Sequence, residues 1–330
     1  MITRRRLVIA IGAIPFAIPR RLRAQQKVRV RRVGFLGSRS RPTLANPDHY
    51  YALVEGLRDL GYVEGKNLAI EWRFADGAYE RLPELAAELV RLNVDIIVTH
   101  GTPGGKAAQQ ATSTIPIVVA ASADPVKSGF AASLSRPGTN LTGLSLISVD
   151  VVPKQLELLK TLRPKLTRVA FLMNPTNPVS ASMLRSVEAV ARTTGTKIVT
   201  VKASTPAEID DAFAIIARER VDALVVSVDS FLITQFRRVA ALSSKHRLPS
   251  LAEQRDYVAS GGLMSYGQNL ADFYRRAAVY VDKIFKGAKP GELPIEQPTK
   301  IHFAINRTTA KVLGITIPKE LILRADEVIE

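Results

Sequence analysis

The chain has 330 residues, of which 46 are Lys or Arg and 30 are Asp or Glu, and it contains no cysteine. A chain of this length folds more naturally as two domains than as one. Without cysteine there can be no disulfide, thiolate metal site or cysteine nucleophile. The surplus of positive charge is spread along the chain and forms no basic stripe interleaved with aromatic residues, so nucleic-acid binding is not expected.

Residues 1–24 have the pattern of a cleaved export signal. Arg4 to Arg6 form a basic start, and the apolar run from Leu7 to Pro19, 13 residues long, is too short to span a bilayer. Cleavage is expected after Ala24, and the stretch from Thr3 to Val8 also fits a twin-arginine signal. A basic disordered tail is the alternative interpretation. The signal predicts a periplasmic protein.

Short apolar strands and amphipathic helices alternate through the first half of the remaining chain. Pro47, with Asn46 as a candidate N-cap, opens a helix that ends at Gly61. Strands are predicted at 33–37, 67–74, 95–99 and 116–121, with further helices at 82–92 and in a segment that ends at Ala111.

The second half repeats this order of elements. The strand at 32–36 returns at 168–172, the strand at 94–98 returns at 221–225, and 115–118 has a weaker echo at 248–251, each about 130 residues later. That distance is too long for a solenoid repeat and suits two lobes of one architecture. Strands are predicted at 168–173, 197–201, 223–228 and 263–266, and helices at 179–193, 206–219, 230–245 and 269–286.

This alternation predicts an α/β fold of two doubly wound lobes, each a parallel sheet with helices on both faces. The chain is expected to cross between the lobes near 137–143, near Gly267 and within 287–298, so that the crossings form a multi-strand hinge beside a ligand cleft. The expected division is a signal at 1–24, lobe one at 31–141 plus 268–290, and lobe two at 142–267 plus 291–330.

Ligands of open α/β sheets bind beyond the carboxyl ends of the strands, and this rule selects the candidate ligand-binding residues. The selected loops are rich in hydroxyl and carboxylate groups and poor in Lys and Arg. Hydroxyls and helix N-termini suit a ligand carboxylate, and acidic residues suit an ammonium, so a zwitterion such as an amino acid is favoured over a phosphate-rich ligand. The candidates are Ser38, Gly101, Thr102, Ser122, Asp124, Asn174, Asp229, Glu253 and Tyr266.

The candidates also have purely structural explanations. Asp124, Asp229 and Thr102 could cap helices. Glu253 could lie on a solvated helix, and Tyr266 could belong to the core. No catalytic or metal-binding constellation is found, because the four histidines lack close ligand spacing, the glycine-rich stretches lack phosphate-loop spacing, and no acid/base pair stands out. An enzyme activity, a metal and a cofactor are therefore not expected.

Several long motifs are shared with a known family. They lie at 23–26, 33–36, 122–126, 134–143, 261–267, 280–284 and 296–300. In these stretches, and along its whole length, the chain resembles the TrpX-like group of ABC transporter substrate-binding proteins, which have the type I periplasmic-binding fold. The resemblance implies that a small solute is captured by hinge closure and delivered to the membrane permease of an ABC importer. Aromatic or other hydrophobic amino acids are the ligands associated with the group.

The expected partners are thus a small-molecule ligand and a permease, and a monomer is expected. One alternative is a two-lobed cytoplasmic enzyme such as a sugar-nucleotide transferase, which would need a basic or glycine-rich diphosphate site. Another is a transcriptional regulator with the same ligand-binding fold. It would need an N-terminal helix-turn-helix, which the apolar and basic residues 1–30 do not predict.

Overall fold

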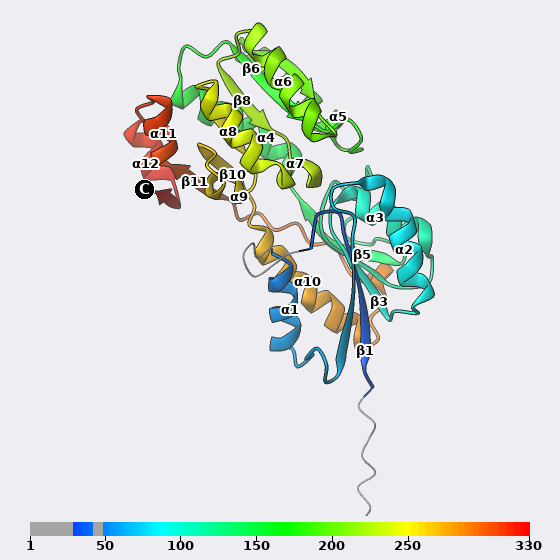
Figure 1. The fold of residues 1–330 in the computed structure, drawn as a ribbon. Coiled ribbons are helices and arrows are strands. Elements are labelled where there is room, and N and C mark those ends of the chain that lie inside the picture. The colour runs from blue at the N-terminus through cyan, green and yellow to red at the C-terminus, as the bar shows by residue number, and fades with distance from the viewer. Residues whose placement is uncertain (1–28, 42–48) are drawn as a thin grey trace, which may run out of the picture.

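The computed structural model describes residues 29–41 and 49–330. The predicted export signal and the predicted helix start at Asn46 and Pro47 lie outside these residues. The described chain forms two α/β lobes, one below the other in Figure 1. No helix in this part of the chain combines the length and the apolar character that crossing a membrane requires.

The first lobe is built on a five-stranded sheet of order β2-β1-β3-β4-β5, in which every pair of neighbouring strands is parallel. Helices α1 and α10 pack on one face of this sheet, and α2 and α3 pack on the other (Figure 1). The strands are β1 Arg31–Gly37, β2 Leu68–Phe74, β3 Ile96–Thr99, β4 Ile117–Ala123 and β5 Leu141–Leu146. The helices are α1 Tyr50–Asp59, α2 Leu82–Arg91, α3 Gly101–Ala111 and α10 Leu270–Phe285, with a short 3₁₀ turn, η1, at Tyr79–Arg81.

The second lobe is built on a seven-stranded sheet of order β12-β11-β10-β9-β8-β6-β7. Its strands are β6 Arg168–Met173, β7 Lys197–Lys202, β8 Ala223–Val226, β9 Ser250–Ala252, β10 Met264–Gly267, β11 His302–Asn306 and β12 Glu327–Ile329. Its helices are α4 Ser148–Leu162, α5 Ser180–Thr193, α6 Pro206–Arg218, α7 Ser230–Thr234, α8 Phe236–Lys245, α9 Asp256–Ala259, α11 Arg307–Leu313 and α12 Lys319–Arg324.

Both faces of the second sheet are covered. Val169 and Phe171 of β6 pack with α4 and α5, whereas Ala170 and Leu172 of the same strand pack with α6 and α8. This double burial explains why the strand sequence is an apolar run rather than an alternating one. Only one pair in this sheet departs from the expected parallel order, because β11 runs antiparallel to β10.

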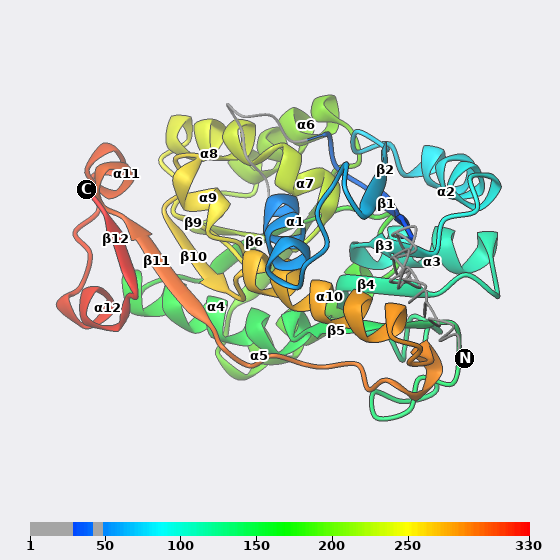
Figure 2. The same cartoon turned by 90° about the horizontal axis from the view of Figure 1, so that it is seen from below.

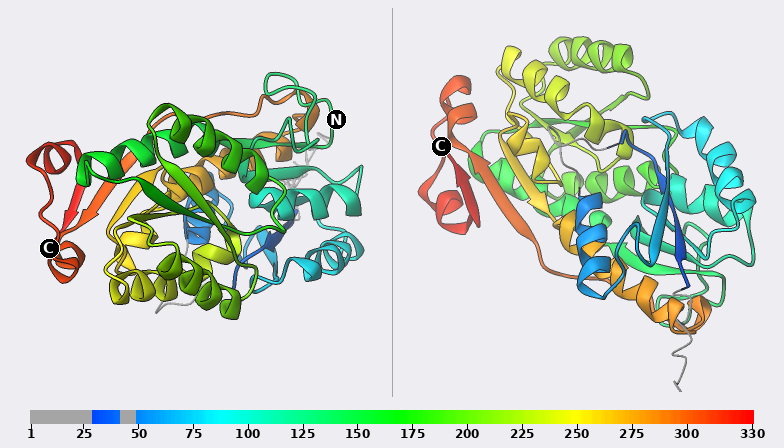
Figure 3. Two further views of the ribbon diagram at one scale, coloured as in Figure 1. Left: turned by 90° about the horizontal axis from the view of Figure 1, so that it is seen from above. Right: turned by 60° about the horizontal axis from the view of Figure 1, so that its bottom comes forward.

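The chain passes between the lobes three times. It leaves the first lobe between β5 and α4, returns between β10 and α10, and leaves again after the 3₁₀ turn η2 (Pro290–Glu292) through the extended segment that leads to β11 (Figure 2). The views in Figure 3 show the same passages lying close together. Several strands therefore connect the two lobes, which is the arrangement of a hinge.

Two boundaries differ from the expected ones. The turn-rich passage 137–143 does not cross between lobes but leads into β5, which pairs with β4. Gly143 makes this edge pairing possible, because a Cβ at this position would lie 2.1 Å from the carbonyl oxygen of Val119. The backbone of Glu296 in turn pairs beside β5. The first sheet thus continues to Leu146, beyond the expected boundary at 141. The segment around Glu296, which was expected to belong to lobe two, pairs with the first lobe.

Candidate functional site

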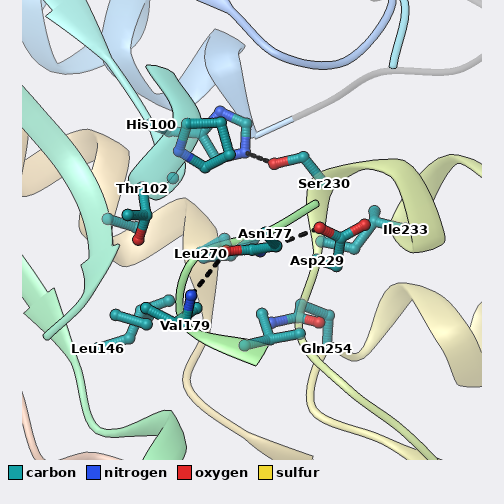
Figure 4. A pocket seen from close by; sticks show the side chains of 15 residues that line it. His100, Thr102, Leu146, Asn177, Val179, Asp229, Ser230, Ile233, Gln254 and Leu270 are labelled. Atoms are coloured by element: carbon teal, nitrogen blue, oxygen red, sulfur yellow. Dashed lines mark hydrogen bonds between the residues drawn. The ribbon is translucent and has the colours of Figure 1, made fainter. Parts of the chain in front are cut away.

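A cavity lies between the two lobes, at the carboxyl ends of strands from both sheets. The free space between its walls is about 410 Å³ when space open to solvent is included. Its walls are mostly apolar and its polar groups are few, as in small-molecule sites generally. The first lobe contributes His100, Gly101, Thr102, Pro103, Ala121, Ala123, Leu146 and Leu270, and the second contributes Asn177, Val179, Val228, Asp229, Ser230, Ile233 and Gln254 (Figure 4).

The first-lobe side of the cavity is the N-terminus of α3. Gly101, with φ of 74°, opens the helix in a backbone conformation that favours glycine, and its Cα faces the Ser230 hydroxyl of the other lobe. The Thr102 hydroxyl is buried and has no hydrogen-bond partner among the described residues. Unpaired amides and the helix dipole make such a terminus suitable for an anionic group. Together with the Thr102 hydroxyl, it can hold a carboxylate.

His100 joins this wall to the second lobe. Its Nε2 lies 3.1 Å from the hydroxyl oxygen of Ser230. Complete burial, together with the positive charges of Arg39 and His49, holds the pKa of His100 well below its usual value. The imidazole is therefore neutral near pH 7, and His100 adds hydrogen-bonding capacity to the cavity but no charge.

Asp229 lies on the opposite wall and is already fully hydrogen-bonded. Its side chain caps α7 by accepting from Leu232 N at 3.0 Å. It also accepts from Asn174 Nδ2 at 3.2 Å, from Asn177 Nδ2 at 2.9 Å and from the hydroxyl of Tyr79 at 2.7 Å. A carboxylate offers about four acceptor positions, so four donors occupy them all. The structural explanation as a cap therefore holds, while the carboxylate still lines the cavity.

The Tyr79 hydroxyl reaches Asp229 from the first lobe. It also accepts from Phe231 N at 3.0 Å, so one phenol ties η1 to the start of α7. Burial, and then the negative charge of Asp229, raise the pKa of Tyr79 well above its usual value and keep it a donor. A second link across the cleft joins His49 Nε2 and Asp256 Oδ2 at 2.9 Å. The lobes are thus in direct contact at two places, at the start of α7 and at α9.

Four polar residues that line the cavity were not among the predicted ligand-binding residues, namely His100, Asn177, Ser230 and Gln254. Gln254 follows β9, has an exposed fraction of 2%, and neither its Nε2 nor its Oε1 has a hydrogen-bond partner within the described chain. Asn177 follows β6 three residues beyond the predicted Asn174. Both stand in loops that the strand-end rule selects, but the rule does not say which side chain of a loop faces the ligand.

The predicted neighbour Glu253 faces away from the cavity, toward the hinge. Its Oε1 accepts from the Ser148 hydroxyl at 2.9 Å, while Oε2 is buried without a partner among the described residues. Burial raises the pKa of Glu253 to about 7, against the opposing effect of the Ser148 hydrogen bond. Gly267 packs so closely on it that a Cβ there would lie 2.2 Å from Glu253 Cγ. Tyr266, also predicted, packs against Phe303 in the second lobe and does not line the cavity.

Three further predicted residues lie near the cavity without lining it. The buried Ser122 stands between two wall residues, and its hydroxyl has no partner in the described part of the chain. Ser38 lies beneath the start of α3, with its hydroxyl 3.5 Å from the carbonyl oxygen of His100. Asp124 lies in a second hollow of about 520 Å³, which shares Leu146 with the cavity, and pairs there with Lys127 at 3.1 Å.

Of the predicted residues, Gly101, Thr102 and Asp229 line the cavity itself, and Asn174 supports it through its hydrogen bond to Asp229.

No group of three or more His, Asp or Glu side chains is placed to hold a metal ion within residues 29–41 and 49–330. Among the described residues, the cavity walls contain neither Lys nor Arg. Asp229 is the one acidic side chain among the described residues that line the cavity, and His100 adds no charge. Such a site suits a ligand with one carboxylate, at most one cationic group and a large apolar part.

Comparisons with known proteins agree with this geometry. Residues 45–329 match the family of ABC transporter substrate binding proteins. The chain is 28% identical over 263 residues to a tyrosine-binding protein of Clostridioides difficile strain R20291, covering 79% of this chain and 75% of that protein. It is 30% identical, with a TM-score of 0.85, to the structure of a conserved domain protein of Vibrio cholerae, covering 91% of this chain and all of the other.

Two further structures differ in their state. A complex with L-Trp from Streptococcus pneumoniae is 26% identical and has a TM-score of 0.82, covering 91% of this chain and 100% of that one. A ligand-free, open substrate-binding protein of Clostridium difficile is 25% identical over 91% of this chain and 99% of its own, yet its TM-score is 0.65. At nearly equal identity and coverage, the present structure is more similar overall to the L-Trp complex than to the ligand-free, open protein.

Proposed function

From the premise that this chain belongs to the family of ABC transporter substrate-binding proteins, we propose that its solute is an amino acid with an aromatic or other hydrophobic side chain. The observation that carries the proposal is the cavity itself, which has apolar walls from both lobes between the α3 N-terminus and Asp229. The relatives that bind tyrosine and L-Trp support the same class of ligand.

The amino-acid carboxylate is proposed to bind at the N-terminus of α3. The Thr102 hydroxyl donates to it, and the helix dipole stabilises its charge. Ser122, whose hydroxyl is buried beside the wall, is the second candidate donor. None of the described residues that line the cavity is Lys or Arg, so helix and hydroxyl groups carry this interaction. This explains why the site would exclude phosphate esters, which need more positive charge than one helix end supplies.

The ammonium group is proposed to bind beside Asp229. All four acceptor positions of this carboxylate are occupied in the closed lobes, so an ammonium must replace one of the present donors. Asn177 and Asn174 both donate to Asp229, but only Asn177 is among the residues that line the cavity. Asn177 is therefore the donor that the ammonium is proposed to replace. The ligand side chain then packs against Leu146, Val179 and other apolar walls.

Capture is coupled to closure because the two ends of the ligand lie on different lobes. A ligand shifts a hinge equilibrium only by its difference in affinity for the open and closed forms. A molecule that contacts α3 alone binds both forms equally and closes nothing. One that bridges α3 and Asp229 adds its binding energy to the Tyr79 and His49 contacts that already join the lobes.

The wider setting follows from the family and from the N-terminal pattern. The chain is proposed to be exported through a cleaved signal, to act in the periplasm as a monomer, and to deliver its solute to a permease without chemical change. A sugar-nucleotide transferase is less favoured, because the cavity residues within the described chain do not supply the basic groups that a diphosphate would need. Cell fractionation and sequencing of the mature N-terminus test the export step; a cytoplasmic, uncleaved chain would contradict it.

The ligand class is tested by calorimetry with the chain purified without its first 24 residues. L-tryptophan, L-tyrosine, L-phenylalanine and L-leucine are compared with their deaminated acids and with glucose 1-phosphate. We expect at least one of the amino acids to bind and to raise the melting temperature by mass action, and its deaminated acid to bind more weakly. Binding of none of the four amino acids, or tighter binding of the phosphate ester, would refute the proposal.

A further inference from the structure

Gln254 is the most unusual polar group of the cavity. It is buried to an exposed fraction of 2%, it lines the cavity, and both ends of its amide lack a partner among the described residues. A buried amide without partners is costly, and folded proteins rarely retain one without a reason. In Figure 4 its side chain stands across the cavity from Thr102, at the end remote from the proposed carboxylate position.

The other buried glutamines that the structure describes in this region are satisfied. Gln268, at the start of the α10 crossing, accepts from Ile147 N at 2.8 Å and donates to the carbonyl oxygen of Pro298. Gln155 donates to the carbonyl oxygen of Tyr266 at 3.0 Å. Asn177, the other amide that lines the cavity, is also paired, since it donates to Asp229 and accepts from Val179 N. Within the described chain, the fold thus supplies partners to these amides but not to that of Gln254. This contrast indicates that the partner of Gln254 is the ligand.

We infer that Gln254 is a specificity-determining residue that recognises an uncharged group at the far end of the ligand side chain, one that both donates and accepts a hydrogen bond. The inference rests on the proposed function and deepens it. The Gln254 amide offers a donor at Nε2 and an acceptor at Oε1. A carboxylate could pair only with Nε2 and an ammonium only with Oε1. A hydroxyl group can satisfy both.

An apolar stem is needed between the two polar ends, since the apolar side chains of Leu146 and Val179 line the cavity wall between Thr102 and Gln254 (Figure 4). A phenol on an amino acid combines such a stem with a terminal hydroxyl. An indole offers one donor and no acceptor, and a phenyl ring offers neither. The expected order of affinity is therefore L-tyrosine, then L-tryptophan, then L-phenylalanine. Sites built to hydrogen-bond a hydroxyl discriminate strongly against ligands that lack it.

The test compares these three probes on the wild-type chain and on Gln254→Leu. Wild type should bind L-tyrosine at least ~10-fold more tightly than L-phenylalanine, the effect of one unsatisfied buried amide. Gln254→Leu should abolish or reverse this ratio. The leucine side chain offers no hydrogen bond to the hydroxyl of L-tyrosine, and it packs favourably against the phenyl ring of L-phenylalanine. Gln268→Leu is the matched control and should keep the wild-type ratio.

A second measurement separates recognition from folding. Gln254→Leu should not lower the melting temperature of the ligand-free chain, because its amide stabilises nothing within the described structure, whereas Gln268→Leu should lower it by about 2–4 °C or more as two hydrogen bonds are lost. A Gln254→Leu chain that melts as low as Gln268→Leu would make Gln254 a structural residue and overturn the inference.

The outcomes also separate the two proposals. If wild type binds L-phenylalanine or L-tryptophan as tightly as L-tyrosine, or if Gln254→Leu keeps the wild-type ratio, the role of Gln254 is wrong while amino-acid binding stands. If wild type binds none of the three aromatic probes and does not bind L-leucine either, the proposed function fails and this inference fails with it.

Discussion

Asp229 and Asp124 each follow a strand of their own sheet, and both were predicted to contact the ligand, yet the structure gives them opposite surroundings. Asp229 is buried in a cavity between the lobes and accepts four hydrogen bonds from three elements. Asp124 lies in a second hollow, where it is only partly buried and pairs with the exposed Lys127. A position after a strand therefore does not by itself decide the surroundings of a side chain; the depth of burial and the donors that the rest of the chain supplies decide them.

The comparison is tested by making the same substitution, Asp to Asn, at both positions, and the larger effect is expected at Asp229. Asp229→Asn removes the charge and sets an amide against three side-chain donors and a cap. We expect the free energy of unfolding to fall by about 3 to 4 kcal/mol and amino-acid affinity to fall by ~10²-fold. Urea unfolding and calorimetry measure the two effects. Unchanged affinity in a folded variant would remove Asp229 from the ligand contacts.

The second prediction concerns pH and the hinge carboxyl of Glu253. Its pKa is about 7 in the folded chain against an ordinary value of 4.5, so the folded chain keeps a proton that the unfolded chain releases. The stability that Glu253 contributes is full below pH 4.5 and is lost as the pH rises toward 7, by up to about 3 kcal/mol. Urea unfolding at several pH values should show this loss in wild type but not in Glu253→Gln. Parallel pH profiles for the two chains would contradict the prediction.

A smaller effect is expected where the two lobes touch beside Asp229. Tyr79→Phe removes one hydroxyl that bridges Asp229 and Phe231 N. The closed form should lose about 1 kcal/mol, which weakens ligand binding ~5-fold. Tyr257→Phe is the control, because its hydroxyl donates to Ser250 inside the second lobe. That variant should lose stability and keep its affinity; equal losses of affinity in both variants would exclude a special role for Tyr79 in closure.

The smallest effect is expected at Asp124, the other member of the pair. Asp124→Asn keeps a residue that tolerates the φ of 60° and removes an ion pair whose lysine is exposed to 73%. The free energy of unfolding should change by less than about 0.5 kcal/mol and the ligand affinity should not change. Calorimetry on the same ligand as for Asp229→Asn makes the comparison direct. A loss of affinity near that of Asp229→Asn would place ligand in the second hollow.

Much of the fold could be predicted because its signals are local. Apolar runs located β1, β3, β4, β6 and β8, and amphipathic periodicity located α2, α5 and α6. The prediction that the chain crosses between the lobes at 137–143 was wrong. Pro and Gly indicate a turn, but they do not show whether the next segment pairs with an edge strand or leaves the sheet. The helix expected at 230–245 is divided into α7 and α8 at Gln235. For 137–143, the pairing of β5 with β4 decided the outcome.

The sequence by itself determined the alternation of strands and helices, the two covered sheets, the family, and the loops that hold the site, because each depends on patterns within about twenty residues or on motifs. Only the tertiary structure decided which side chain of a loop faces the cavity. Glu253 and Gln254 are adjacent, yet one faces the hinge and the other the cavity. It also decided that Asp229 is saturated, since one of its donors, Tyr79, stands 150 residues away. Such contacts exist only after the lobes meet.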